Sequence, residues 1–371
     1  MVESLKKNYE HKLYKHVDDV SKAEAVGFCF LNKKDVEHFP YKNVELKDTE
    51  VKIDILYAGL CHSDSMTGRE KWGKVNYPIA PGHEIIGVVS ALGKSCKRLK
   101  IGDKVAFGTT RYCCGQCKQC LNGKEPLCDS QDGEEKFTFG LHWGGYSTCL
   151  VQPESHYFLL KDNIKLELAA PLLCAGITVY NPIKLYCKKG FKTAVAGVGG
   201  LGHLAVKMLH KMGYEVAGIT TSMKKEEDIK KLGADFVIDF NDKSHIEKYT
   251  NYFDFIINTS PVYDGFDKLL KMAAKGGIIS QVGVPDSSET ATFAFGPIVT
   301  KELQIIGSLV GSRNITQEML DFCADNDVYP TCEHFSFEDF GKALDRLENG
   351  RPIFRCVVDC GSYGKKHGLH K

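Results

Sequence analysis

Short runs of alternating or β-branched apolar residues mark the first half of the chain. They cover residues 51–58, 85–91 and 104–107, and turns rich in glycine and proline separate them, as at residues 77–82. Runs of this length bounded by such turns are typical of β-strands. The pattern therefore predicts a mostly β region from residue 1 to about residue 175.

The hydrophobic period changes near Lys192. A strand-like run at residues 193–196 leads through a glycine-rich turn into a helix, whose apolar positions are Leu201, Leu204, Ala205, Met208, Leu209 and Met212. Further strands are predicted at residues 214–219, 236–238, 253–258, 277–282 and 304–309. Six strands with helical crossovers indicate an α/β fold with a doubly wound parallel six-stranded sheet. We expect three segments: a first part of one domain (1–175), the parallel sheet (176–311), and a return to the first domain (312–371).

Composition narrows the class of protein. The 371 residues are 43% hydrophobic and 26% charged, with a net charge of +1, so no global field favours nucleic acid or membrane. The chain starts without an apolar signal segment and contains no run of about 18 apolar residues. We therefore expect a cytoplasmic protein, in which its fifteen cysteines bind metal or stay reduced. Residues 364–371 are expected to form a frayed basic tail.

One group of cysteines has the spacing of a closed metal site. Cys114, Cys117, Cys120 and Cys128 follow one another at intervals of three, three and eight residues. Four thiolates so spaced can surround one tetrahedral Zn²⁺, and a site without an open position is structural.

A second, dispersed set has mixed ligands. It consists of Cys61, the adjacent pair His83 and Glu84, and Cys174. A Cys/His/Glu set leaves room for water or substrate, as catalytic zinc requires. Glu84 is either the fourth ligand or a carboxylate just outside the ligand shell, and Arg355 is its expected counter-ion. Together the two sets predict two zinc ions per chain.

The glycine-rich turn has the sequence G-x-G-x-x-G. It comprises Gly197, Val198, Gly199, Gly200, Leu201 and Gly202, between a predicted strand and a predicted helix. In that context it predicts dinucleotide binding, although such a turn can also be a plain strand-to-helix connection.

The end of the next strand selects the cofactor. An NAD site places a carboxylate there, whereas this chain has Thr220, Thr221, Ser222, Lys224 and Lys225. Hydroxyl and ammonium groups suit a 2′-phosphate, so NADP(H) is predicted. A structural interpretation is compatible with this one: Ser222 caps the following helix and the lysines lie on its solvent face.

The residues after Cys61 suggest a proton path. The hydroxyl of Ser63 is expected to pass a proton to the substrate oxygen and to lie among the cofactor contacts. Asp64 is expected to orient His62 or another group near the metal.

Several motifs together resemble the zinc-containing medium-chain alcohol dehydrogenases, and within them the cinnamyl alcohol dehydrogenases. They are residues 59–64, 81–84, 114–128, 170–176, 197–202, 232–235 and 306–312. The resemblance implies a GroES-like catalytic domain around a Rossmann domain, an active site in the cleft, and a homodimer held through the Rossmann sheets. It implies nicotinamide contacts from Thr259, Gly283, Ser308, Leu309 and Val310. It also implies NADP-dependent reduction of aldehydes to primary alcohols.

One position departs from the family pattern. The family often has a histidine five residues after the first zinc cysteine, where this chain has Met66. The relay then ends either at the cofactor ribose and solvent or at another group. Trp143 either lines an aromatic substrate pocket or belongs to the core. Two further functions stay open: reduction of an activated C=N or C=C bond in a specialised metabolite, and a non-catalytic zinc and nucleotide redox sensor.

Overall fold

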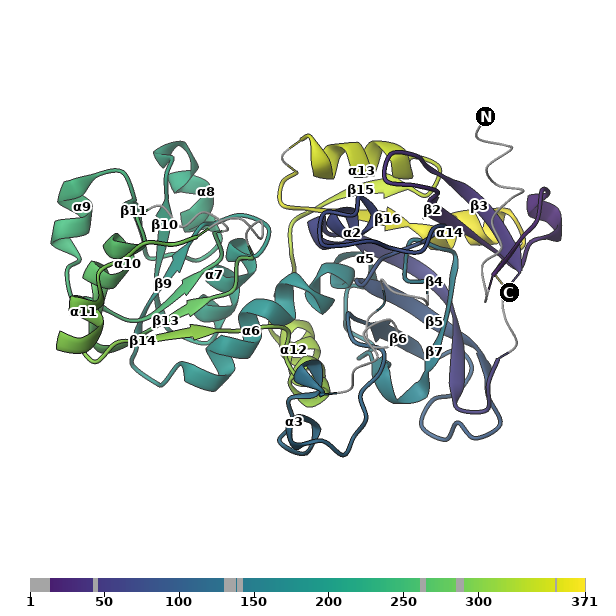
Figure 1. Cartoon of the computed structure of the whole chain (residues 1–371), viewed down its shortest axis with the longest axis horizontal. Coiled ribbons are helices and arrows are strands. Elements are labelled where there is room, and N and C mark those ends of the chain that lie inside the picture. The colour runs from purple at the N-terminus through teal and green to yellow at the C-terminus, as the bar shows by residue number, and fades with distance from the viewer. Residues whose placement is uncertain are drawn as a thin grey trace. The chain divides into compact units, whose positions relative to one another are not determined.

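The computed structural model describes residues 14–42, 46–129, 138, 143–260, 265–284, 290–350 and 352–370. These residues form two compact units (Figure 1). The first unit takes the chain up to Cys174 and again from Ser312 to Asp325 and from Tyr329 onward. The second unit comprises Ala175–Gly311 with Asn326–Val328. The chain thus leaves the first unit after Cys174 and returns to it at Ser312.

A seven-stranded mixed sheet forms the body of the first unit. Its order is β15-β16-β4-β5-β6-β8, with β7 also paired to β4, and a smaller sheet has the order β1-β3-β2. The strands are β1 (Lys15–His16), β2 (Ala25–Phe30), β3 (Val36–Lys42), β4 (Glu50–Leu60), β5 (Ile85–Leu92), β6 (Lys104–Phe107), β7 (Cys149–Pro153), β8 (Phe158–Leu159), β15 (Cys332–Ser336) and β16 (Arg355–Asp359).

Strand β4 is the centre of this sheet, and β5 pairs with it in antiparallel register. Val51, Ile53 and Ile55 of β4 are fully buried in the core of the unit. The register pairs Ala58 with Ile85, so the end of β4 lies beside the start of β5. Residues that immediately follow β4 or precede β5 are therefore brought together.

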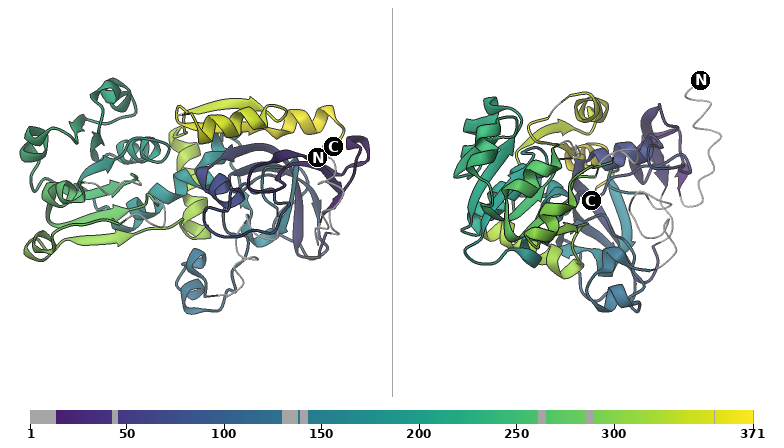
Figure 2. Two further views of the ribbon diagram at one scale, coloured as in Figure 1. Left: turned by 45° about the horizontal axis from the view of Figure 1, so that its top comes forward. Right: turned by 60° about the vertical axis from the view of Figure 1, so that its left-hand side comes forward.

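Short helices and 3₁₀ turns complete the first unit. They are η1 (Val20–Lys22), α2 (His62–Gly68), α3 (Lys118–Leu121), η2 (Glu125–Leu127), η3 (Glu154–His156), α5 (Leu166–Ala169), η4 (Ala170–Leu173), α12 (Arg313–Asn326), α13 (Phe340–Glu348) and α14 (Cys360–Lys366). The segment with α3 and η2 projects from the body of the unit as a separate lobe (Figure 2).

The C-terminal segment is more ordered than its composition predicts. Helix α14 continues to Lys366, Leu369 packs against the core, and His370 Nε2 lies 2.8 Å from the carbonyl oxygen of Thr148. The expectation of a frayed tail is therefore wrong for residues 364–370. The Leu369 side chain and the His370 hydrogen bond fix this segment. The basic composition on which the expectation rested indicates neither contact.

The second unit is the predicted doubly wound α/β fold. Its parallel six-stranded sheet has the order β11-β10-β9-β12-β13-β14, in which the strand order reverses at β9 and β12. The elements are α6 (Ala175–Tyr186), β9 (Lys192–Ala196), α7 (Gly202–Lys211), β10 (Glu215–Thr220), η5 (Met223–Lys225), α8 (Glu226–Lys231), β11 (Phe236–Asp239), α9 (Lys243–Lys248), β12 (Phe253–Asn258), α10 (Phe266–Met272), β13 (Ala273–Gln281), α11 (Phe295–Thr300) and β14 (Gln304–Gly307).

The last strand is shorter than predicted. Strand β14 ends at Gly307, where its ladder with β13 ends at the pair Gln281–Gly307. Ser308 and Leu309 are apolar or small enough for a strand, but β13 offers no further partner beyond Gln281. These two residues therefore lie in the loop that follows the sheet.

No single helix in the described part of the chain has the length and apolar character needed to cross a membrane. Only a bent pair, Leu166–Leu173 with Ala175–Tyr186, meets those criteria together, on length and composition alone.

Candidate functional site

The mixed ligand set comes together in the first unit. Cys61 follows β4, the pair His83 and Glu84 precedes β5, and Cys174 follows η4, which packs against both strands. One ligand atom from each residue lies within 4.8 Å of the others, and the two sulfurs are 3.9 Å apart. Three of the four residues are buried and Cys174 is half-buried. The antiparallel pairing of β4 with β5 thus accounts for a cluster whose members are far apart in sequence.

One carboxylate oxygen of Glu84 accepts a hydrogen bond, and the other has no partner among the described residues. Its Oε1 accepts a hydrogen bond from Arg355 Nη2, which confirms the expected counter-ion. Its Oε2 is buried and has no hydrogen-bond partner among the described residues. Burial raises the pKa of Glu84 to about 7, against the lowering effect of Arg355. A buried carboxylate oxygen without a partner, beside two thiols, fits a bound cation.

Gly59 makes the space that Glu84 occupies. A Cβ on Gly59 would overlap Glu84 Oε2 and lie 2.9 Å from Glu84 Cβ. The backbones of the two residues are also joined, since Gly59 N donates to the Glu84 carbonyl at 2.8 Å. Any larger residue at this position would displace the carboxylate.

His83 is oriented by a buried carboxylate. Its Nδ1 lies 2.8 Å from Asp64 Oδ1, which also accepts the N–H of Gly82 at 2.9 Å. Burial lowers the pKa of His83, but Asp64 and Cys61 together raise it well above its usual value. With Nδ1 held by Asp64, Nε2 is the ring atom left to bind a metal, as in metal-ligating histidines generally. The partner of Asp64 is thus His83, and His62 is exposed.

Tyr146 is a member of this cluster that the sequence did not indicate. Its hydroxyl donates to Asp64 Oδ2 at 3.1 Å, and both side chains are fully buried. Burial and the charge of Asp64 raise the pKa of Tyr146 well above its usual value, so the phenol keeps its proton. The only sequence signal was the two glycines that precede it.

The four-cysteine set occupies the projecting lobe. Sulfurs of Cys114 and Cys120 are 4.0 Å apart, as are those of Cys117 and Cys128, and all four lie within 4.8 Å of one another. The N–H groups of Cys120 and Asp129 both donate to Cys117 Sγ at 3.5 Å and lower its pKa to about 6. Backbone donors aimed at sulfur stabilise thiolates, so this lobe fits a closed tetrahedral zinc site.

Ser63 lies in the first turn of α2, which starts directly after Cys61. Its side chain is half-buried, and its hydroxyl makes no hydrogen bond to the described residues. Met66 is half-buried one turn further along the same helix. Arg69 holds the end of α2 to Glu348 of α13, with Nη2 3.1 Å from Oε2. The C-terminal end of the helix that carries Ser63 is therefore held to α13.

The glycines of the turn after β9 have three distinct roles. Gly197 has φ +83°, which favours glycine, and a Cβ on Gly202 would overlap the Gly197 carbonyl oxygen. A Cβ on Gly199 would meet nothing within 4 Å, so its backbone is open to a ligand. Val198, Gly200 and Leu201 complete the turn before α7. Tight turn, open approach and close helix packing are the features that a pyrophosphate-binding turn needs.

The residues expected to bind a ribose phosphate follow β10. Thr220 is buried and its hydroxyl accepts the N–H of Ser222 at 3.2 Å, while Thr221, Lys224 and Lys225 are exposed. Ser222 occupies the N-cap position of η5, yet its side chain makes no capping hydrogen bond. The helix-capping interpretation of Ser222 is therefore wrong in this structure.

Residues expected near the nicotinamide gather at the carboxyl ends of neighbouring strands. Asn258 of β12 pairs with Ala196 of β9 and with Gln281 of β13, which pairs in turn with Gly307 of β14. Within three residues after these strand ends come Gly197, Thr259, Gly283 and the run Ser308, Leu309 and Val310. Asn181 Nδ2 holds Ser308 Oγ at 3.0 Å. The strand-order reversal lies between β9 and β12, which is where dinucleotides bind in such sheets.

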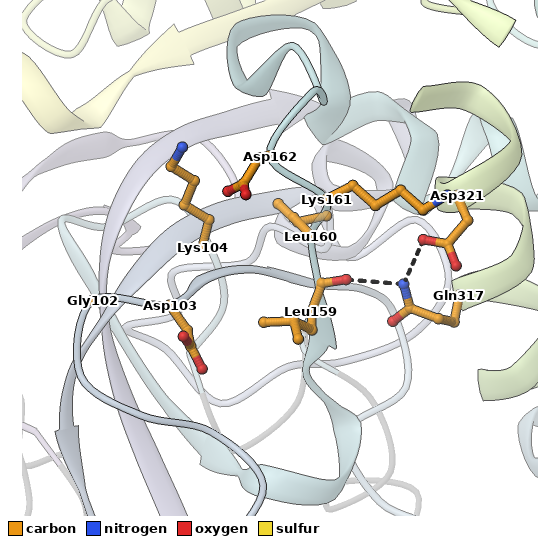
Figure 3. Close-up of a pocket in the computed structure, with 9 residues that line it drawn as sticks. All are labelled: Gly102, Asp103, Lys104, Leu159, Leu160, Lys161, Asp162, Gln317 and Asp321. Atoms are coloured by element: carbon orange, nitrogen blue, oxygen red, sulfur yellow. Dashed lines mark hydrogen bonds between the residues drawn. The ribbon is translucent and has the colours of Figure 1, made fainter. Parts of the chain in front are cut away.

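Two other features lie outside the candidate site. Trp143 is 2% exposed, stacks on Tyr14 at 4.2 Å between ring centroids and donates from Nε1 to the Pro78 carbonyl, so it belongs to the core. A pocket of about 610 Å³ on the first unit contains none of the candidate residues (Figure 3). Its lining is Gly102, Asp103, Lys104, Leu159, Leu160, Lys161, Asp162, Gln317 and Asp321.

Comparison with known proteins identifies the class. The alcohol dehydrogenase GroES-like domain matches residues 47–162, and the zinc-binding dehydrogenase domain matches residues 200–325. The chain therefore belongs to the zinc-binding, medium-chain alcohol dehydrogenases: it is an oxidoreductase that uses zinc and NAD(P) and acts on alcohols or aldehydes.

The similar proteins include dehydrogenases with different names. A probable formaldehyde dehydrogenase of Bacillus subtilis is 36% identical over 85% of this chain and 91% of its own. Cinnamyl alcohol dehydrogenase 8 of Arabidopsis thaliana is 34% identical over 92% of this chain and 96% of its own. The CAD protein of Helicobacter pylori, solved in complex with NADP(H), has a TM-score of 0.82 and 33% identity, over 91% of this chain and 98% of that one.

Proposed function

We propose that this protein is an NADP(H)-dependent aldehyde reductase that converts aldehydes to primary alcohols at a catalytic zinc. The observation that carries the proposal is the buried cluster of Cys61, His83, Glu84 and Cys174, with a carboxylate oxygen that has no partner among the described residues. The glycine-rich turn after β9 and the similarity to a Helicobacter pylori protein that was solved with NADP(H) support it.

We assign two zinc ions to each chain. Cys61, His83, Glu84 and Cys174 would hold the catalytic ion, and Cys114, Cys117, Cys120 and Cys128 the structural one. When bound, the catalytic ion polarises the substrate carbonyl and the nicotinamide supplies a hydride. Side chains of this chain position the ligands: Asp64 holds His83, and Arg355 holds Glu84. Asp64, Arg355, His83 and Glu84 are all buried, which keeps water away from that side of the cluster.

We assign proton delivery to Ser63. Reduction adds a hydride at the carbonyl carbon and requires a proton at the oxygen. The Ser63 hydroxyl lies two residues beyond Cys61 and has no competing hydrogen bond among the described residues. Met66 carries no proton, so the path beyond Ser63 leads to the cofactor ribose and solvent.

We assign NADP(H) rather than NAD(H) from the residues after β10. Thr221, Lys224 and Lys225 are exposed and the hydroxyl of Ser222 makes no cap, so hydroxyl and ammonium groups face the solvent where a 2′-phosphate would lie. The sequence offers no carboxylate between Thr220 and Lys225 to bind a free 2′-hydroxyl. Charge-assisted hydrogen bonds to phosphate are the strong ones.

Thr221→Asp tests this cofactor assignment. The wild type is expected to prefer NADPH in kcat/KM, and the variant to lose about 10- to 100-fold of that preference. A carboxylate repels the phosphate and accepts from the 2′-hydroxyl, and hydrogen bonds to charged groups are worth about 1.5–3 kcal/mol. Thr250→Asp makes the same change at an exposed site on the second unit and should leave the ratio unchanged. Equal kcat/KM for NADPH and NADH in the wild type would refute the assignment.

We also propose a homodimer formed through the second unit. Strand β14 is the edge of the parallel sheet, and apolar side chains lie exposed on it and on α11. Phe295 is 74% exposed, Val299 is 73% exposed and Ile305 is 38% exposed. An edge strand flanked by exposed apolar groups is a template for pairing with another chain.

A further inference from the structure

Two chain segments, residues 80–82 and 144–146, lie against each other directly before His83. The N–H groups of Gly144, Gly145 and Tyr146 donate to the carbonyl oxygens of Ala80, Gly82 and Pro81 at 2.7, 2.8 and 2.9 Å. A Cβ on Gly82 would lie 2.7 Å from the backbone nitrogens of Gly145 and Tyr146, and Gly82 has φ +117°. Tyr146 is therefore fixed against the segment that leads directly into His83.

The side chain of Tyr146 completes the hydrogen bonding of Asp64. Asp64 Oδ1 accepts hydrogen bonds from His83 Nδ1 and the N–H of Gly82, and Oδ2 accepts one from the Tyr146 hydroxyl. The carboxylate is fully buried, so each oxygen needs a donor in place of water. Among the described residues, Tyr146 is the donor to Oδ2. Its ring is held in turn by an edge contact with Phe340, 4.8 Å between centroids.

We propose that Tyr146 is a positioning residue for the catalytic metal. It holds Asp64, Asp64 holds the imidazole of His83, and His83 presents Nε2 to the ion. This inference rests on the proposed function of the Cys61, His83, Glu84 and Cys174 cluster. Without the phenol hydroxyl, Asp64 Oδ2 loses its donor, and only the two hydrogen bonds to Oδ1 still hold the carboxylate that orients the His83 ring. Groups that orient metal-bound histidines act on metal retention in this way.

Tyr146→Phe tests the proposal, because it removes one hydroxyl and keeps the ring against Phe340. The full chain is loaded with two zinc ions, and their release to a chromophoric chelator is followed over time. We expect one of the two ions to leave about tenfold faster than from the wild type, at the low end of the 10- to 100-fold typical of such outer partners. The other ion, in the four-cysteine lobe, should leave at its wild-type rate.

Tyr157→Phe is the matched control. Tyr157 is a buried tyrosine of the same unit, and its hydroxyl donates to the Val51 carbonyl at 2.9 Å. The variant loses one tyrosine hydrogen bond, as Tyr146→Phe does. Among the described residues, however, the Tyr157 hydroxyl makes no hydrogen bond to Asp64. Both ions should leave this variant at wild-type rates. Faster release of the same ion from both variants would mean general loosening of the unit and would overturn the proposal.

A double-mutant cycle shows whether Tyr146 affects zinc release through Asp64 or independently of it. On an Asp64→Ala background, Tyr146→Phe should change release by less than about twofold, because the group it acts through is gone. A full additional tenfold effect on that background would overturn the proposal, as would wild-type release from Tyr146→Phe alone. A wild type that binds fewer than two zinc ions would instead contradict the proposed function, before any variant is compared.

Discussion

Cys61→Ser is expected to lower kcat/KM for aldehyde reduction by about 10³-fold or more while the fold survives. A serine hydroxyl is a far weaker zinc ligand than a thiolate, and the remaining cluster keeps only His83, Glu84 and Cys174. Metal polarisation of a carbonyl is worth several kcal/mol of barrier, and each 1.36 kcal/mol is a factor of ten. Cys61 follows β4, a strand that Val51, Ile53 and Ile55 anchor in the core, so the sheet does not depend on the metal.

Zinc analysis, thermal unfolding and steady-state kinetics together check this prediction. The variant should hold one zinc per chain and unfold near the wild-type temperature. Cys117→Ser should also lose one zinc but should lose stability as well, because a structural metal contributes folding energy to its lobe. Cys332→Ser, the same change at a half-buried cysteine outside both clusters, should retain both ions and full activity. Two zinc ions and full activity in Cys61→Ser would contradict the catalytic assignment.

Ser63→Ala is expected to reduce kcat by about 10²- to 10⁴-fold, the range that positioned acid–base groups supply. Its hydroxyl is the proton-carrying group that follows Cys61 on α2, and alanine preserves the helix. Met66→Ala is the matched control, one turn further along the same helix. A thioether has no proton to give, so its removal should alter only packing and leave kcat close to wild type.

The pH–rate profiles of these variants are the decisive data for the relay. Met66→His should match or exceed the wild-type rate and add a pH dependence near neutrality, where histidine titrates. Full kcat in Ser63→Ala would show that the proton comes from water or from another side chain.

The sequence predicted most of the fold where the pattern was strong and local. The runs at residues 51–58 and 104–107 are strands β4 and β6, and the parallel sheet has its six strands. The sheet of β1–β3 was not foreseen, and β14 stops short because its neighbour ends at Gln281. Both the small sheet and the end of β14 depend on which distant segments pair. The pattern of hydrophobic residues along the sequence does not show that pairing.

The candidate site divides in a similar way. Cysteine and histidine at characteristic spacings indicated the ligand atoms, because metal ligation limits which residue types serve. The groups that orient those ligands were only partly foreseen. Arg355 was expected opposite Glu84. Tyr146 was not expected, and Gly59 was expected only as part of a family motif, without a role. A phenol or a glycine has no spacing rule, and only the antiparallel contacts near β4 and β5 bring them to the cluster.

Following NADPH absorbance with the zinc-loaded wild type, across a panel of aldehydes, imines and enals, tests the central claim most directly. We expect oxidation of NADPH with aldehydes to give primary alcohols, slower reaction with NADH, and loss of the reaction when a chelator removes the metal. Reaction confined to imines or to the C=C bond of enals, or no reaction with any member of the panel, would contradict the assignment as an aldehyde reductase.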